Sequence, residues 1–215
     1  MWRRCTLPLA IFLIASSLAF AQPVLRTVSP AVNSASYRIS GSSGSGVAQG
    51  SLFTVFGTGL GPSPWVTANA FPLPAKLGGT SVTVTVNGAS TAALVVFAYG
   101  TQVSAVLPST TPTGSGSITV TYNGQTSASA PIQVVAGAFG IYTFNSAGSG
   151  QAIATHGDGQ LNTIIQTFHP GDLDVLWGTG LGAIACSDDG APPIGNVGEI
   201  QVYVGNSTAN VSYHG

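Results

Sequence analysis

The sequence predicts an all-β protein, an antiparallel β-sandwich, from three observations. Short runs rich in valine and threonine alternate apolar with polar residues, as strands do when one face is buried. Turn-forming residues separate these runs at short intervals, and 29 of the 215 residues are glycine. No segment has the apolar spacing of an amphipathic helix. Strands joined by tight turns therefore explain the pattern better than alternating strands and helices.

The clearest strand covers Thr80 to Val86, where valine alternates with hydroxyl residues. Asn87-Gly88 follows and favours a tight hairpin, because both residues tolerate a positive φ. We expect Ala93 to Ala98 to be the returning strand. Further strands are predicted at residues 103–107, 117–122 and 131–135. Together these strands make residues 50–136 one complete sandwich module.

Residues 1–21 are predicted to be a signal peptide. Two arginines supply positive charge near the start, and residues 7–20 form a mostly apolar run. Ala19 and Ala21 are the small residues that a signal peptidase recognises. The run is shorter than the ~20 residues of a membrane span, and an uncleaved anchor is the alternative. We expect cleavage after Ala21 and a secreted or cell-surface protein that does not span the membrane after cleavage.

The segment that follows, residues 22–49, is interpreted as an N-terminal lead that ends in a flexible Gly/Ser linker at residues 40–46. Cleavage of the signal peptide would remove Cys5 and leave Cys186 as a lone cysteine. A lone cysteine forms no internal disulfide, so we expect packing to supply the stability of the fold. The role of Cys186 stays open among a reactive thiol, a link between two chains and an inert side chain.

An internal repeat organises the rest of the chain. Residues 50–61, GSLFTVFGTGLG, recur as residues 171–182, GDLDVLWGTGLG. Residues 82–88 have a counterpart in residues 200–206. The stretch between the two copies, residues 137–170, is predicted to be a connecting β-hairpin region.

The second copy, residues 171–215, lacks everything equivalent to residues 101–135. It is therefore interpreted as a truncated second module that cannot complete a sandwich alone. Either the chain is a shortened two-module unit, or another chain supplies the missing strands. In both cases the edge of the second copy is open to strand pairing.

Charge is scarce, which limits the partners that the chain can bind. Charged residues make up 5% of the sequence, against about 25% in an average soluble domain. The 5 basic residues form no patch that could neutralise phosphates, so we expect no nucleic-acid partner. The formal net charge is −1.

No motif for catalysis, a cofactor or a metal is predicted. The glycines at residues 57–61 lack the Lys-Ser/Thr of a phosphate loop and are interpreted as a turn that directs Leu60, and Leu181 in the second copy, into the core. His156, Asp158 and Asn162 supply too few carboxylates for a calcium loop. A turn at Gly157-Asp158-Gly159 explains that segment.

Two carboxylates are the remaining catalytic candidates. Asp172 and Asp174 are predicted to lie on one face of a strand, where paired carboxylates could cleave a glycosidic bond. Solvation of an edge strand is the competing interpretation. We expect the protein not to be an enzyme, and a glycoside hydrolase is the remote alternative.

Aromatic residues are the better functional candidates. Trp65 and Phe71 lie in a proline-rich loop, and Tyr99 lies at the end of a strand. These three residues are the predicted ligand contacts, since aromatic rings on loops of a sandwich can stack on sugars. Trp65 could instead close one end of the sandwich. Trp177, where the first copy has Phe56, is expected to lie in the core.

Several motifs that run in order along the chain carry a family resemblance. They are Val32-Asn33-Ser34-Ala35-Ser36-Tyr37, Phe56-Gly57-Thr58-Gly59-Leu60-Gly61, Pro72-Leu73-Pro74, Leu77-Gly78-Gly79, Phe139-Gly140-Ile141-Tyr142, Asp158-Gly159-Gln160-Leu161-Asn162 and Pro170-Gly171-Asp172. This set resembles the Solibacter-type C-terminal domain family of secreted acidobacterial proteins, which is related to IPT/TIG immunoglobulin-like modules. The family pattern continues past the end of this chain and usually follows a larger exported protein.

The resemblance implies an extracellular accessory module with an immunoglobulin-like fold and no catalysis, and it carries over no ligand and no functional residue. The predicted function is accordingly a non-catalytic structural or adhesive module at the cell surface or outside the cell. A carbohydrate-binding accessory module is the alternative. The expected partners are an extracellular glycan or protein.

Overall fold

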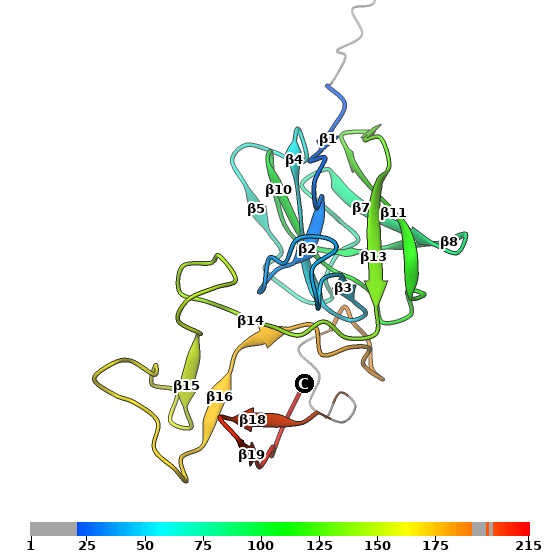
Figure 1. Ribbon diagram of the computed structural model, residues 1–215. Coiled ribbons are helices and arrows are strands. Elements are labelled where there is room, and N and C mark those ends of the chain that lie inside the picture. Colours follow the sequence, from blue (N-terminus) through cyan, green and yellow to red (C-terminus); the bar gives the residue numbers. More distant parts are fainter. Residues whose placement is uncertain (1–20, 191–196, 198–199) are drawn as a thin grey trace, which may run out of the picture.

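A computed structural model describes residues 21–190, 197 and 200–215 of the chain (Figure 1). The predicted signal peptide lies outside the described residues, apart from Ala21. The described residues form strands, turns and loops. They include no helix that is long and apolar enough to cross a membrane.

Two sheets form a β-sandwich in the first part of the chain (Figure 1). The first sheet contains, in order, β1 (Val24–Leu25), β4 (Leu52–Thr58), β10 (Gln102–Val106), β9 (Leu94–Tyr99) and β5 (Val66–Thr67), with β2 (Ala31–Asn33) also on β4. The second contains β3 (Val47–Ala48), β13 (Ala130–Val135), β11 (Gly114–Tyr122), β7 (Thr80–Val86) and β6 (Lys76–Leu77), with β12 (Gln125–Thr126) on β11 and β8 (Ala89–Ala92) on β7. All pairs are antiparallel except β3 with β13. The predicted fold class, an all-β immunoglobulin-like sandwich, is confirmed.

The core lies between the two sheets. Val82, Val84 and Val86 of β7 are fully buried, as their alternation with hydroxyl residues predicts. Phe53 and Val55 of β4 meet them from the first sheet and are fully buried as well. Burial of these apolar side chains between the two sheets stabilises the fold.

β7 has the predicted bounds, and the hairpin after it turns as the sequence indicates. Asn87 and Gly88 have φ values of +51° and +79°, and Val86 pairs with Ala89 directly across the turn. The predicted return over Ala93 to Ala98 is wrong. A two-residue loop forces the very next residues to pair, so β8 is the returning strand, and β9 belongs to the opposite sheet.

Residues 22–49 differ from the predicted lead and linker, because they contribute three strands to the sandwich. β1 and β2 pair with β4, and β3 pairs with β13. The Gly/Ser stretch folds back on itself: Arg38 donates a hydrogen bond from Nη1 to the carbonyl of Ser43 at 2.7 Å. Strands of two or three residues carry too weak a periodicity to be recognised before the partner strand is known.

The remaining described residues form small two-stranded sheets (Figure 1). β14 (Gly140–Ile141) pairs with β17 (Gly178–Thr179), β15 (Ala154–His156) with β16 (Asp174–Leu176), and β18 (Val202–Val204) with β19 (Ser207–Ala209). We call residues 137–215 the second unit. Its strands from the predicted connecting region, β14 and β15, pair with strands of the second repeat copy. The predicted hairpin is also present: Thr143 bridges Ala152 in antiparallel fashion, and the amide of Phe144 donates a hydrogen bond to the carbonyl of Gln151 at 3.1 Å.

Among its described residues, the second unit has no facing sheet that would bury its side chains. Trp177 is 52% exposed, so the expectation that it lies in the core is wrong. Leu60 is fully buried, as predicted, whereas Leu181 is only partly buried. The same motif therefore has a core position in the first copy and a surface position in the second.

Candidate functional site

Two of the three predicted ligand contacts, Trp65 and Tyr99, lie next to the β5–β9 pairing at one edge of the first sheet. β5 pairs with β9 so that Val66 lies opposite Ala98. Trp65 precedes Val66 and Tyr99 follows Ala98, so these two residues come directly after the last pair of the β5–β9 ladder. Trp65 is 58% exposed and Tyr99 is 37% exposed. An aromatic surface at the β5–β9 edge is thus accessible to solvent.

A residue that the sequence analysis missed, Phe97, supports this surface. The ring centroids of Trp65 and Phe97 are 5.9 Å apart, with an angle of 32° between the rings. This tilted pair lies within the range of distances at which aromatic rings attract each other, and it restricts the orientation of the exposed indole. Phe97 lies two residues before Tyr99, on the same face of the strand, and this spacing is the signal that could have identified it.

Phe71 does not join this pair through any ring contact among the described residues. It lies in the loop between β5 and β6 and is 53% exposed. The aromatic surface is accordingly defined by Trp65, Phe97 and Tyr99. The ring of Trp65 packs on Phe97 of β9, the strand next to β5.

Asn33 joins the sandwich to the second unit. Its side chain is nearly fully buried, and Nδ2 donates hydrogen bonds to the carbonyls of Ala138 at 3.0 Å and Thr179 at 3.1 Å. Its Oδ1 accepts hydrogen bonds from the amides of Ala35 at 2.8 Å and Ser36 at 3.0 Å. Both donors and both acceptor sites of the amide are therefore used, as burial of such a group requires.

A second junction holds the loop after β10 against the second unit. Asp188 accepts hydrogen bonds from Ser109, from the amide at 2.9 Å and from Oγ at 2.6 Å. Ser109 Oγ in turn accepts a hydrogen bond from the amide of Ile184 at 2.9 Å. Asp188 is thus a structural carboxylate, and Cys186 between these contacts is exposed.

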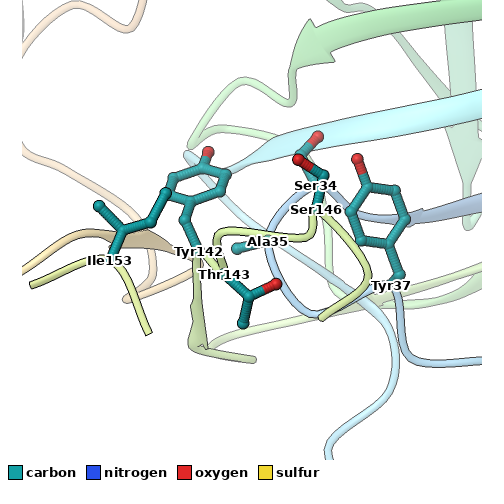
Figure 2. Close-up of a pocket in the computed structure, with 7 residues that line it drawn as sticks. All are labelled: Ser34, Ala35, Tyr37, Tyr142, Thr143, Ser146 and Ile153. Carbon is teal, nitrogen blue, oxygen red and sulfur yellow. The ribbon is translucent and has the colours of Figure 1, made fainter. Parts of the chain in front are cut away.

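A small cavity lies beside the Asn33 junction (Figure 2). Its volume is about 170 Å³, and it is lined by Ser34, Ala35, Tyr37, Tyr142, Thr143, Ser146 and Ile153. Figure 2 shows the rings of Tyr37 and Tyr142 on opposite sides of the serine hydroxyls. Burial raises the pKa of Tyr142 above its ordinary value of 10.0, and the nearby Tyr37 raises it further. The cavity is smaller than typical ligand pockets of roughly 300–1,000 Å³, so we assign the functional contact to the aromatic surface.

The carboxylates considered for catalysis do not share a strand face. Asp174 begins β16, whereas Asp172 lies in the turn before it. Asp172 accepts a hydrogen bond from the amide of His169 at 2.7 Å and lies 3.5 Å from the ring nitrogen Nδ1 of the same residue. The prediction that both carboxylates lie on one face of a strand is wrong, because the strand begins at Asp174 and does not include Asp172. The paired-carboxylate hypothesis therefore loses its geometric basis.

Residues 156–162, which were considered above as a metal-binding loop, contain the predicted turn. The amide of Gly159 donates a hydrogen bond to the carbonyl of His156 at 2.9 Å, and Asp158 Oδ1 accepts one from the amide of Gln160 at 3.0 Å. Gly159 has a φ of +86°. Across the described part of the chain, no group of three or more His, Cys, Asp or Glu residues could hold a metal ion.

The glycines at residues 57–61 also form the predicted turn. A Cβ at Gly57 would collide with the carbonyl of Val24, so only glycine permits this approach of β1 to β4. Gly59 has a φ of +66°, and the amide of Leu60 bonds to the carbonyl of Gly100 at 3.0 Å. The motif is a structural turn that delivers Leu60 to the core.

Comparison with known proteins agrees with this architecture. The family model described as IPT/TIG domain matches residues 23–135, which is the sandwich from just before β1 to the end of β13. A search of the curated proteins finds no match. IPT/TIG domains are immunoglobulin-like modules that are generally not enzymes and occur commonly in adhesion and receptor proteins. With more than half of its length matched, the chain belongs to the IPT/TIG domain family.

Proposed function

We propose that the protein is an exported structural or adhesive module that acts at the cell surface or outside the cell without catalysing a reaction. The family supports a non-catalytic role. The predicted signal peptide of residues 1–21 supports export. We also propose that the chain is a member of the Solibacter-type C-terminal domain family, on the motifs quoted above.

The aromatic surface is the observation that carries the adhesive role. Trp65 is more than half exposed although its ring packs on Phe97. Such a side chain loses little conformational freedom when it contacts a partner, because the packing already restricts it. Tryptophan and tyrosine are also the residues that contribute most often to binding energy at interfaces.

The adhesive role is tested by measuring how the purified protein binds to cell envelopes. We expect Trp65→Ala to reduce binding several-fold. Trp177→Ala is the matched control, since Trp177 has a similar exposed fraction of 52% and lies outside this surface. Equal binding by wild type and both variants would exclude the aromatic surface as the contact.

Carbohydrate binding is the second candidate, favoured by the tilted ring pair of Trp65 and Phe97, with the exposed Tyr99 on the same face of β9 as Phe97. Aromatic faces stack on sugar rings, and the phenol hydroxyl can bond to a sugar hydroxyl. A glycan array distinguishes the two roles. Absence of any signal, or a signal that Trp65→Ala leaves unchanged, would exclude carbohydrate binding through these residues.

Export has its own test. Sequencing of the N-terminus of the exported protein should find Gln22 as the first residue. Recovery of Met1 on the exported protein would contradict cleavage.

A further inference from the structure

Four side chains form a row across the first sheet, perpendicular to its strands. Arg26 follows β1, and its amide donates a hydrogen bond to the carbonyl of Phe56 in β4 at 2.9 Å. Gln102 of β10 lies opposite Phe56 on one side and opposite Tyr99 of β9 on the other. The row therefore runs from Arg26 through Phe56 and Gln102 to Tyr99, where it reaches the aromatic surface.

The row lies on the outer face of the sheet. The residues next to its members, Leu25, Val55, Val103 and Ala98, belong to the core or pack against it. Successive residues of a strand point to opposite faces, so the side chains of the row point away from the core. Adjacent strands are about 4.8 Å apart, and the row crosses from β1 over β4 and β10 to β9, so it is about 14 Å long. One sugar ring is shorter than this, so only an oligosaccharide could contact the whole row.

Arg26 presents a guanidinium group that three contacts hold in place. Nε donates a hydrogen bond to the carbonyl of Val28 at 2.7 Å, and Nη2 donates one to the carbonyl of Ser29 at 2.8 Å. Cζ lies 4.8 Å from the centre of the Phe56 ring, which is a cation–π contact. Arg26 is nevertheless exposed. Nη1 makes no hydrogen bond within the described part of the chain, so the charged group can still donate to a ligand.

The charge of Arg26 has no counter-ion on the sandwich. Residues 22–135 contain no aspartate or glutamate, and the acidic residues of the chain begin at Asp158. The ion pair found among the described residues joins His169 and Asp172 in the second unit. An ordered, exposed guanidinium without a carboxylate partner is complementary to an anion, and its planar donor arrangement matches the two oxygens of a carboxylate.

Two neutral polar groups lie between Arg26 and Trp65 on this face. The side-chain amide of Gln102 and the hydroxyl of Tyr99 make no hydrogen bond within the residues that the structure describes. Both groups can donate and accept, as binding of sugar hydroxyls requires. Across the strands, the outer face thus offers the ring pair of Trp65 and Phe97, then two hydrogen-bonding groups, then one cation.

We propose that this outer face binds an acidic oligosaccharide, with a sugar ring on the aromatic surface and the carboxylate of a uronic acid unit on Arg26. Nη1 and Nη2 would donate to the two carboxylate oxygens. The inference rests on the carbohydrate-binding candidate described above and adds the class of sugar to it. The aromatic rings and neutral hydrogen-bonding groups favour a sugar over an acidic peptide, which would pair with Arg26 alone.

The probes are hexamers of glucuronate, galacturonate and mannuronate, each with its carboxyl-reduced counterpart. The members of a pair share the linkage and differ only in the carboxylates. Isothermal titration calorimetry with the intact protein measures the affinities. We expect at least one uronate to bind about three- to ten-fold more tightly than its reduced counterpart at low salt. This preference should decrease at high salt, because ions screen an exposed charge pair.

Protein variants assign the preference to one side chain. Arg26→Gln should remove the preference and leave the binding of the reduced hexamer largely unchanged. Arg26→Lys keeps the charge without the planar donor arrangement, so the preference should be intermediate. Lys76→Gln is the matched control, since it removes the same charge from β6 in the second sheet and should keep the preference.

Two further measurements keep the test decisive. Trp65→Ala should weaken the binding of both members of a pair by the same factor, because the aromatic contact is common to them. Urea denaturation checks the folding of Arg26→Gln, whose lost hydrogen bonds to Val28 and Ser29 join β1 to the following loop. If this variant does not fold, the salt dependence of wild type and the weaker preference of Arg26→Lys decide the outcome.

The inference and the carbohydrate role fail in different ways. Binding of reduced hexamers that depends on Trp65, without any preference for uronates, would overturn the inference and leave the carbohydrate role intact. A preference that persists in Arg26→Gln, or that Lys76→Gln also removes, would overturn the inference as well. Tighter binding of a glutamate hexapeptide than of every uronate would identify a peptide ligand instead. Absence of binding to all of the hexamers would exclude both the inference and the carbohydrate role for these sugars.

Discussion

The side-chain amide of Asn33 donates a hydrogen bond to the carbonyl of Thr179, 146 residues further along the chain. Asn33 ends β2 of the sandwich, and Thr179 ends β17 of the second unit. This contact, with its companion to the carbonyl of Ala138, ties the sandwich to the second unit through one buried side chain. The amide is the only side-chain type that can donate twice and accept twice here without a net charge.

Asn33→Ala should lower the free energy of unfolding by about 2–4 kcal/mol, because it leaves buried amides and carbonyls without partners. Urea denaturation measures this. Asn69→Ala is the control, since Asn69 is exposed in a loop, and it should change the free energy by less than about 0.5 kcal/mol. Equal stability of the two variants would contradict the role assigned to Asn33.

Leu60→Ala and Leu181→Ala compare the same motif position in the two copies. Leu60 is fully buried and Leu181 is only partly buried. We expect a loss of about 2–5 kcal/mol for Leu60→Ala and a clearly smaller loss for Leu181→Ala. The free energies of unfolding are obtained from the midpoints of urea denaturation, with one value for the slope of free energy against urea concentration in both variants. A larger loss at Leu181 would show that the second unit has a core of its own.

Gly88→Val should lower the free energy of unfolding of the sandwich by about 1–2 kcal/mol, whereas Gly88→Asn should lower it by less. The φ of Gly88 is +79°, a conformation that β-branched residues avoid and asparagine tolerates. No atom lies within 4 Å of a Cβ built at this position, so backbone conformation alone decides the cost. Thermal unfolding of both variants measures the difference, and equal melting temperatures would rule out the conformational explanation.

The raised pKa of Tyr142 predicts that the folded protein loses stability at alkaline pH. Its pKa is raised in the folded protein by burial and by Tyr37, so above pH 10 the unfolded chain loses this proton more readily than the folded one. The contribution is fully present below pH 10 and decreases as the pH rises toward the raised pKa. Unfolding free energies measured from pH 8 upward should decline less in Tyr142→Phe than in wild type. Parallel curves would refute this assignment.

Local chemistry was enough to predict the elements whose signal lies within a few residues. The alternation in β7 and the Asn87-Gly88 loop fixed the strand, the turn and the buried face, because a pleat and a positive φ depend on adjacent residues. The aromatic surface was predicted in part. Trp65 and Tyr99 are exposed on one edge, but Phe97 was missed and Phe71 lies apart, since ring contacts depend on which strands pair.

The sequence by itself determined the all-β class and the sandwich built on alternating strands. Only the tertiary structure decided that the predicted lead supplies β1 to β3, that β9 crosses to the opposite sheet, and that the second copy exposes Trp177 and Leu176. The physical reason is that a motif specifies the conformation of its own backbone, whereas burial requires a facing layer. β10 and the second sheet provide that layer around β4, and the described residues provide none around β16.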